Sequence, residues 1–299
     1  MPERTDYFWT STARVPSRTY WKPIDGVSTR ILEFGEVTAT PLIMVHGTGG
    51  HAEAFIRNVA ALSEHYRVIL YDLPAHGWSS APQRAYEIAD YITHLEKITE
   101  ELDISEFLLC GQSLGGWIAS RFAAQNGARV QRLVLVGAGG LDSDVTRMRA
   151  VRQQSLDAVH RATEAAVRRR LEAIMSHPEH ATDELVHCRM AIYSQADAEQ
   201  RMDYALRLQD PGVRSRNILR PEELGRIVSP TLVLSGDADR IVPPRTSLRL
   251  SRYIPDASYS EIGPAGHWPQ FEQPKQFNEL VLTFLNRDQS PKSKESNNE

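Results

Sequence analysis

Residues 111–115, which read Gly-Gln-Ser-Leu-Gly, form the segment most clearly suited to catalyse a reaction, and a serine stands at its centre. An apolar run precedes this segment and a helical pattern follows it, which predicts a sharp turn from strand to helix. Such a turn forces Ser113 into a strained backbone conformation and leaves room only for small residues two positions away. Ser113 would then stand at a helix N-terminus, where free N–H groups and the helix dipole favour negative charge. We therefore expect a nucleophile that attacks a carbonyl carbon.

A serine hydroxyl is a weak nucleophile unless a histidine removes its proton and a carboxylate orients that histidine. His267 fits the first role because it follows the last predicted strand, in a loop that reads Gly-Pro-Ala-Gly-His-Trp. The carboxylate is expected in residues 236–243, directly after another predicted strand. Asp239 is the preferred candidate, and Asp237 is interpreted as a turn residue that binds nearby backbone N–H groups. The predicted triad is therefore Ser113, Asp239 and His267.

A second glycine-rich loop, residues 46–50 with the sequence His-Gly-Thr-Gly-Gly, lies between an apolar strand and a helical pattern. We expect the backbone amides of Thr48 and Leu114 to form the oxyanion hole. Each donor of this kind contributes about 3 kcal/mol to transition-state stabilisation. A phosphate-binding loop is rejected because no Lys-Ser or Lys-Thr follows the glycines, and a Gly-x-Gly-x-x-Gly pattern is absent too. His46 is interpreted as structural, and so is His76 in a later loop.

The elements that must position these residues alternate between strand and helix in the first half of the chain. The runs at residues 42–45 and 133–136 are apolar at every position, as parallel strands covered on both faces require. These patterns predict an α/β fold with a mostly parallel twisted sheet, flanked by helices and connected by right-handed crossovers. The predicted strands span residues 29–34, 42–45, 67–71, 106–110, 132–136, 231–235 and 257–262, and the predicted helices of the first half span residues 52–62, 87–102 and 114–125.

Residues 141–225 interrupt this alternation with helical spacing and almost no strand signal. Because strands return afterwards, we interpret them as an all-helical lid inserted into the core. The hydrolase core then comprises residues 1–140 and 226–287, and the polar residues 288–299 are expected to form a disordered tail. The three consecutive arginines at residues 168–170 are interpreted as a solvated face of a lid helix.

The composition of the 299 residues is that of a globular protein, with 41% hydrophobic and 24% charged residues. A net charge of -4 without a long basic block argues against nucleic acid or an anionic membrane as a partner. The sequence has neither the apolar length of a membrane span nor the N-terminal pattern of a signal peptide. Cys110 and Cys188 are interpreted as buried free thiols, with a disulfide as the less favoured alternative. We expect a cytoplasmic protein without a metal or organic cofactor, because no Cys/His cluster has ligand spacing.

The set of motifs resembles the α/β-hydrolase fold, and more narrowly the meta-cleavage-product hydrolases, which cut carbon–carbon bonds in ring-opened aromatic compounds. The narrower resemblance rests chiefly on residues 266–272, which read Gly-His-Trp-Pro-Gln-Phe-Glu. Residues 237–243 and the lid segment 182–189 support it. The resemblance implies that Arg189 faces the dienoate end of the substrate and that Trp268 lines the same pocket.

Both assignments have plainer alternatives: an exposed arginine in an arginine-rich lid, and a tryptophan packed in the core beside the active site. A chemical reason favours a cation, because a carbon leaving group departs only if its negative charge is delocalised onto a ketone or carboxylate. Gln112 stands where the family commonly has Asn, and it is assigned to the substrate-binding site as well. The loops at residues 46–51 and 72–80 also depart from the family pattern. These departures bear on substrate identity and pocket shape, not on the triad.

The resemblance implies hydrolysis of a 2-hydroxy-6-oxo-hexa-2,4-dienoate-type product of aromatic ring cleavage to 2-hydroxypenta-2,4-dienoate and a carboxylic acid. Two alternatives stay open at this point: a carboxylesterase or lactonase with the same triad, and a non-catalytic ligand receptor on this fold. Ser113 argues against haloalkane dehalogenases and epoxide hydrolases, which resemble this fold but use an aspartate nucleophile. The expected partner is a small-molecule substrate, and the sequence leaves open whether the chain forms a homo-oligomer.

Overall fold

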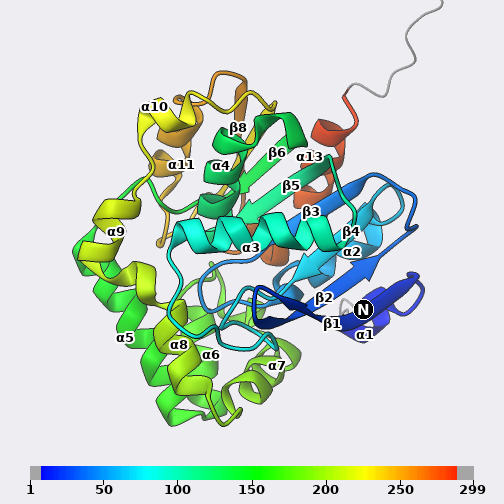
Figure 1. Ribbon diagram of the computed structural model, residues 1–299. Coiled ribbons are helices and arrows are strands. Elements are labelled where there is room, and N and C mark those ends of the chain that lie inside the picture. Colours follow the sequence, from blue (N-terminus) through cyan, green and yellow to red (C-terminus); the bar gives the residue numbers. More distant parts are fainter. Residues whose placement is uncertain (1–7, 288–299) are drawn as a thin grey trace, which may run out of the picture.

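The computed structural model describes residues 8–287 and contains one eight-stranded sheet with helices on both faces (Figure 1). The strands lie in the order β1-β2-β4-β3-β5-β6-β7-β8, and only the pairs β1–β2 and β2–β4 are antiparallel. The predicted tail, residues 288–299, lies outside the described residues. The strands are β1 Ser17–Ile24, β2 Val27–Phe34, β3 Pro41–Val45, β4 Arg67–Tyr71, β5 Phe107–Gln112, β6 Val130–Val136, β7 Thr231–Gly236 and β8 Ala257–Ile262.

All seven predicted strands are present, with ends that agree to within two residues. The sequence patterns miss β1, an edge strand that pairs only with β2. Most of its side chains are exposed or half-buried, so it lacks the apolar run that marks the central strands. The mostly parallel sheet is therefore confirmed, and the antiparallel pairs lie at one edge of it.

The helices that flank the sheet explain why the central strands are apolar at every position. In β5, Leu108 and Cys110 point into one apolar layer, and Phe107 and Leu109 point into the other. Helices α2 and α13 cover the first layer, and α3, α4 and α11 cover the second (Figure 1). These helices and their short neighbours are α1 Phe8–Thr12, α2 Ile56–Leu62, α3 Ile88–Glu101, α4 Leu114–Gln125, α11 Pro244–Ser251, α12 Pro269–Glu272 and α13 Pro274–Leu285.

Between β6 and β7 the chain forms only helices and turns. Side-chain N-caps begin four of these helices: Asp144, Thr163, Thr182 and Asp210 each accept a hydrogen bond from a backbone N–H of the first turn. We call residues 141–225 the helical insertion; its helices α5 to α8 lie together at one end of the sheet, whereas α10 lies beside α4 (Figure 1). Its helices are α5 Val145–Arg161, α6 Glu164–Glu172, α7 Asp183–Tyr193, α8 Ala198–Ala205, α9 Pro211–Asn217 and α10 Pro221–Leu224.

Two smaller expectations concern membranes and cysteines. Within residues 8–287, no helix combines the length and the apolar character that crossing a membrane requires. Cys110 is a buried free thiol, as expected. Cys188 is also free, but it is partly exposed, so the expectation that it is buried is wrong.

Candidate active site

Ser113 stands at the turn between β5 and α4, in the position predicted for a nucleophile. Its backbone has a φ of 55° and a ψ of -111°, a combination that strains any residue with a side chain. The N–H of Ser113 donates to the carbonyl of Val136, and its carbonyl accepts from the N–H of Gly139, both at 2.9 Å. The neighbouring strand β6 and the loop after it thus hold the strained conformation in place.

The glycines on either side of Ser113 let the turn pack with no space for a side chain. A Cβ atom on Gly111 would lie 2.2 Å from the carbonyl oxygen of Gly115. A Cβ atom on Gly115 would lie 2.0 Å from the carbonyl oxygen of Val45. The steric requirement that the sequence pattern predicts is therefore present. Since α4 begins at Leu114, the free N–H groups of its first turn lie beside the serine.

The side chains of His267 and Asp239 are hydrogen-bonded and buried, with 2.8 Å between Nδ1 and Oδ2. The other oxygen of Asp239, Oδ1, accepts hydrogen bonds from the N–H groups of Ile241 and Val242 at 2.8 and 2.9 Å. These two bonds fix the orientation of the carboxylate. Because Nδ1 donates to the carboxylate, Nε2 is the imidazole nitrogen that remains able to accept a proton.

Asp237, the alternative carboxylate, contacts the backbone instead of the imidazole. Its Oδ1 accepts a hydrogen bond from the N–H of Ala265 at 2.9 Å. This bond joins the turn after β7 to the loop that carries His267. The contact agrees with the interpretation of Asp237 as a turn residue.

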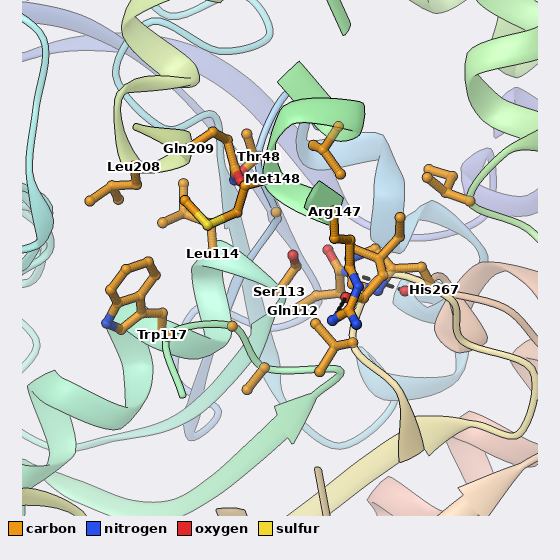
Figure 2. A pocket seen from close by; sticks show the side chains of 18 of the residues that line it. Thr48, Gln112, Ser113, Leu114, Trp117, Arg147, Met148, Leu208, Gln209 and His267 are labelled. Atoms are coloured by element: carbon orange, nitrogen blue, oxygen red, sulfur yellow. Dashed lines mark hydrogen bonds between the residues drawn. The ribbon is translucent and has the colours of Figure 1, made fainter. Parts of the chain in front are cut away.

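Ser113 and His267 line one cavity, which encloses about 930 Å³ with its opening to solvent included (Figure 2). The predicted oxyanion-hole residues Thr48 and Leu114 line the same cavity. Gln112 lies there too, and its Nε2 donates to the carbonyl of His267 at 3.0 Å. Its Oε1 is buried and has no hydrogen-bond partner within residues 8–287, so it can accept one from a ligand. The arrangement places a hydroxyl, an imidazole and two candidate amide donors around one space.

Arg189 and Trp268, the residues assigned to the substrate by resemblance, pack against each other in the cavity wall. Each is only 3% exposed, so the alternative of an exposed arginine is wrong. The guanidinium carbon of Arg189 lies 5.1 Å from the centre of the Trp268 ring, where a cation is attracted to the face of the ring. For Trp268 the two interpretations coincide, because the residue is both packed and part of the cavity wall.

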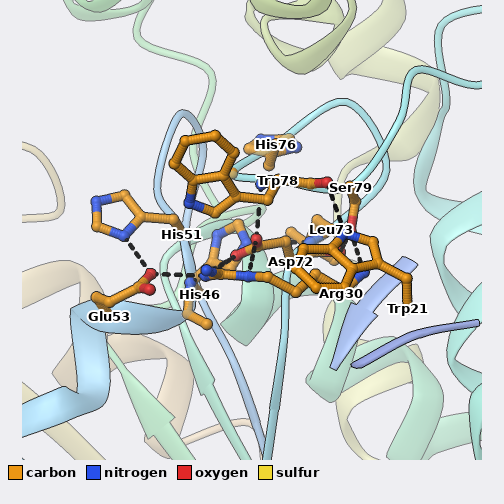
Figure 3. Close-up of polar contacts among 12 residues, drawn as sticks. Trp21, Arg30, His46, His51, Glu53, Asp72, Leu73, His76, Trp78 and Ser79 are labelled. Carbon is orange, nitrogen blue, oxygen red and sulfur yellow. Dashed lines mark hydrogen bonds and ion pairs between the residues drawn. The ribbon is translucent and has the colours of Figure 1, made fainter. Parts of the chain in front are cut away.

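A buried network of charged side chains joins the loops after β3 and β4 (Figure 3). Arg30 contacts two carboxylates, with 2.8 Å from its Nε to Asp72 and 2.7 Å from its Nη2 to Glu53. Asp72 also accepts hydrogen bonds from the N–H groups of Ala52 and Trp78, both at 2.7 Å. The loop that carries the expected oxyanion donor is thus fixed from two sides.

His46 and His76 complete this support (Figure 3). Nε2 of His46 accepts from the N–H of Leu73 at 3.0 Å, and its Nδ1 donates to the carbonyl of Gly47 at 2.8 Å. Nδ1 of His76 donates to the carbonyl of Pro74 at 2.9 Å. Burial lowers the pKa of both histidines to about 3. They are therefore neutral at pH 7 and hold backbone groups, in agreement with their structural interpretation.

One group of side chains in the described part of the chain has its donor atoms within 4.8 Å of one another, as a metal site would: His51, Glu53 and Cys188. The carboxylate of Glu53 already contacts Arg30 at 2.7 Å and His51 at 2.8 Å. A metal cation would be repelled by the guanidinium of Arg30. We therefore interpret these residues as part of the charged network.

Comparison with known proteins agrees with this geometry. Residues 40–274 match the family described as alpha/beta hydrolase fold. The chain is 30% identical to 2-hydroxy-6-oxo-2,4-heptadienoate hydrolase of Pseudomonas putida, over 87% of this chain and 93% of that protein. It is 31% identical to 2-hydroxymuconate semialdehyde hydrolase of a Pseudomonas species (strain CF600), over 87% and 91%. The solved structure of a meta-cleavage product hydrolase from Pseudomonas fluorescens is 30% identical, with a TM-score of 0.77 over 90% of this chain and 97% of that one. The chain belongs to the meta-cleavage-product hydrolases.

This membership confirms the family resemblance and the α/β-hydrolase fold. It also identifies the protein as an enzyme and not a receptor that merely shares the fold.

Arg170 also lines the cavity, although the sequence pattern did not mark it as a site residue. The interpretation of residues 168–170 as a solvated helix face is wrong for this residue, which is only 8% exposed. Arg168, by contrast, forms ion pairs with Glu164 and Asp183 at the surface. One signal points to the difference: Arg170 is four residues from Ile174, so the two share the apolar face of the helical pattern.

Glu272 holds the loop of the imidazole in place. Its buried carboxylate accepts from the N–H of Gly266 at 2.9 Å and from that of Trp268 at 3.1 Å, on both sides of the histidine. It also accepts from the N–H and hydroxyl of Ser176 at 2.7 Å and contacts His180 at 3.1 Å. Burial raises the pKa of Glu272, but the hydrogen bonds from His180 and from backbone amides outweigh it and lower the pKa.

A further bond joins this loop to the helical insertion. The N–H of His267 donates to the carbonyl of Ile174 at 2.7 Å. Together with the Ser176–Glu272 contacts, this hydrogen bond attaches the backbone of His267 to the segment that follows α6. The position of the imidazole therefore depends on the insertion as well as on the sheet.

Replacing Glu272 by Gln is expected to destabilise the fold by about 3 kcal/mol, because an NH₂ group would face backbone N–H donors. The loss should appear as a lower urea midpoint and as reduced kcat, since the His267 loop loses its anchor. Glu279→Gln, an exposed change on α13, is the matched control and should shift stability by less than about 0.5 kcal/mol. Equal stability of the two variants would show that the contacts of Glu272 contribute nothing.

Acid is expected to destabilise the protein below about pH 6.5, where histidines of the unfolded chain take up protons. His46 and His76 stay neutral in the folded state down to a pH of about 3. The contribution of these histidines to the free energy of unfolding is therefore complete above pH 6.5. Below this pH it decreases by on the order of 1 kcal/mol per pH unit for each histidine. Thermal unfolding at pH 7, 6 and 5 measures this slope. A midpoint that does not change between these pH values would contradict the prediction.

Proposed function

We propose that the protein hydrolyses the C5–C6 bond of a 2-hydroxy-6-oxo-hexa-2,4-dienoate-type product of aromatic ring cleavage. The observation that carries this proposal is Arg189, a buried guanidinium that lines the same cavity as Ser113. An ester or lactone releases an alkoxide that needs only a proton, whereas a carbon leaving group needs a cation near the atoms that receive its charge. The reactions named for the similar proteins from Pseudomonas belong to the same class.

The reaction begins when the dienol substrate becomes its keto tautomer: the proton of the C2 hydroxyl is transferred to C5, with Arg189 near the carboxylate end. His267, oriented by Asp239, then takes the proton of Ser113 while the serine Oγ bonds to the C6 carbonyl carbon. The strained turn at Ser113 presents the hydroxyl to the cavity and keeps it there without further reorganisation.

The amides of Thr48 and Leu114 donate to the oxyanion that forms at C6. When the oxyanion collapses, the C5–C6 bond breaks and its electron pair moves from C5 through the double bond onto the oxygen of C2. Protonation of this enolate gives 2-hydroxypenta-2,4-dienoate. Water, activated by His267, then hydrolyses the acyl–serine ester and releases the carboxylic acid.

We assign the helical insertion, residues 141–225, to a lid over a core made of residues 1–140 and 226–287. Support comes from the cavity wall, to which α5 contributes Met148 (Figure 2). Helix α7 contributes Arg189 to the same wall. A cover of this kind excludes water and strengthens the electrostatic contacts beneath it. The proposed setting is the cytoplasm, the substrate is a small molecule, and the chemistry needs neither a metal nor an organic cofactor.

Purified protein should bleach the yellow dienoate, and Ser113→Ala should lower kcat by at least about 1,000-fold while leaving substrate affinity nearly unchanged. Spectrophotometry with dienoates that carry hydrogen, methyl or phenyl at C6 measures both quantities. Ser215→Ala, at an exposed position of α9, is the matched control and should retain full activity. Addition of a chelator should not change the rate.

Other outcomes would assign the triad differently. Cleavage of short aryl esters with no change in dienoate absorbance would favour a carboxylesterase or lactonase. Tight binding of a dienoate without turnover of any carbonyl substrate would contradict the hydrolytic proposal altogether.

A further inference from the structure

Two buried guanidinium groups without carboxylate partners line the cavity. Arg170 comes from α6 and Arg189 from α7, and they are 8% and 3% exposed. Among residues 8–287, neither forms a salt bridge with Asp or Glu. Burial and the like charge of Arg189 together lower the pKa of Arg170 to about 10. Two neighbouring cations withdrawn from water destabilise the ligand-free protein unless an anion joins them.

Each of these guanidinium groups also keeps an unsatisfied donor. Nε of Arg170 donates to the hydroxyl of Ser155 at 3.1 Å, but its Nη1 is buried and has no partner in the described part of the chain. Nη1 of Arg189 lies 3.5 Å from the hydroxyl of Tyr193, and its Nε is likewise without a partner. Buried donors are rarely left unpaired because each one costs free energy. Both guanidinium groups can therefore donate a hydrogen bond to a ligand that accepts one.

The other arginines that line the cavity have hydrogen-bond or ion-pair partners within the protein. Arg147 forms an ion pair with Asp144 at 3.1 Å. Arg214 donates to the backbone carbonyls of Asp142 at 2.7 Å and Leu208 at 3.3 Å. Among the described arginines that line the cavity, only the pair from α6 and α7 keeps buried guanidinium nitrogens without a hydrogen-bond partner.

The pair lies on the imidazole side of the cavity. Arg189 stacks on Trp268, the residue after His267. Arg170 lies four residues before Ile174, whose carbonyl accepts the N–H of His267. An anion held by both arginines would thus be next to the site of proton transfer.

We propose that Arg170 is a second substrate-binding cation, which acts with Arg189 to hold the carboxylate and the adjacent C2 oxygen of the substrate. This inference rests on the proposed function. Before cleavage, the substrate carries one negative charge at this end. When the C5–C6 bond breaks, its electron pair moves onto the C2 oxygen, so the same end then carries two. A second cation matches the charge that develops in the transition state and stabilises it more than the ground state.

The kinetic test replaces Arg170 by Gln. We expect kcat/KM for the dienoate to fall about 100-fold, with much of the loss in kcat, because the enolate charge is no longer matched. Arg170→Lys should regain part of the loss, since it restores the charge without the planar geometry. Arg169→Gln, the exposed neighbour on α6, is the control and should change neither kcat nor KM.

A stability measurement separates this role from a structural one. If Arg170 exists to bind an anion, Arg170→Met should raise the unfolding temperature of the ligand-free protein, because it removes an uncompensated buried charge. A residue that merely supports the fold through Ser155 would give the opposite sign. A lower unfolding temperature combined with unchanged kcat/KM would overturn the inference.

Calorimetry with 2-oxopentanoate distinguishes failure of this inference from failure of the proposed function. The wild type should bind this 2-oxo acid, and Arg170→Gln should weaken binding at least about tenfold. If the dienoate is not hydrolysed but this binding and its dependence on Arg170 persist, the reaction is assigned wrongly and the anion site stands. Absence of binding to the wild type, or equal binding to Arg170→Gln and Arg169→Gln, overturns the two-arginine site.

Discussion

The site depends on one close contact, between the first turn of α4 and the end of β3. The carbonyl of Val45 leaves no space for a side chain at Gly115, and this proximity accompanies the strained conformation of Ser113. Because α4 starts so near β3, the loop after β3 and the N-terminus of α4 face the same space. The two expected oxyanion donors, Thr48 and Leu114, are thereby brought together by backbone packing alone. His267 follows β8, and two bonds position it: Gln112 donates to its backbone carbonyl, and Asp239 accepts from its imidazole.

The parts that the sequence predicted well are those in which information is local. The apolar run at residues 42–45 and the helix at residues 114–125 are marked by their own residues and by the turns around them. Asp239 and His267 were placed together because both follow parallel strands, and such strands end at the same edge of a sheet. Chain order and edge geometry therefore sufficed for this pair, although the two residues are far from Ser113 in the sequence.

The parts that were missed depend on distant partners. β1 carries mostly exposed side chains, and only its pairing with β2 makes it a strand. Arg170 has two charged neighbours of its own kind, so local composition favours solvent, whereas the cavity and Arg189 determine its burial. The network around Arg30 likewise joins three separate segments, and the residue spacing within any one segment does not predict these ion pairs.

The attachment of the His267 backbone to the helical insertion has a consequence for the reactivity of the site. The carbonyl of Ile174 and the backbone of Ser176 are bonded to the loop of His267 and to its anchor Glu272. If the insertion swings away at this point, the same movement releases the base from its alignment. The reactivity proposed for Ser113 would then depend on the position of the insertion, because only an aligned imidazole can take the proton of the serine.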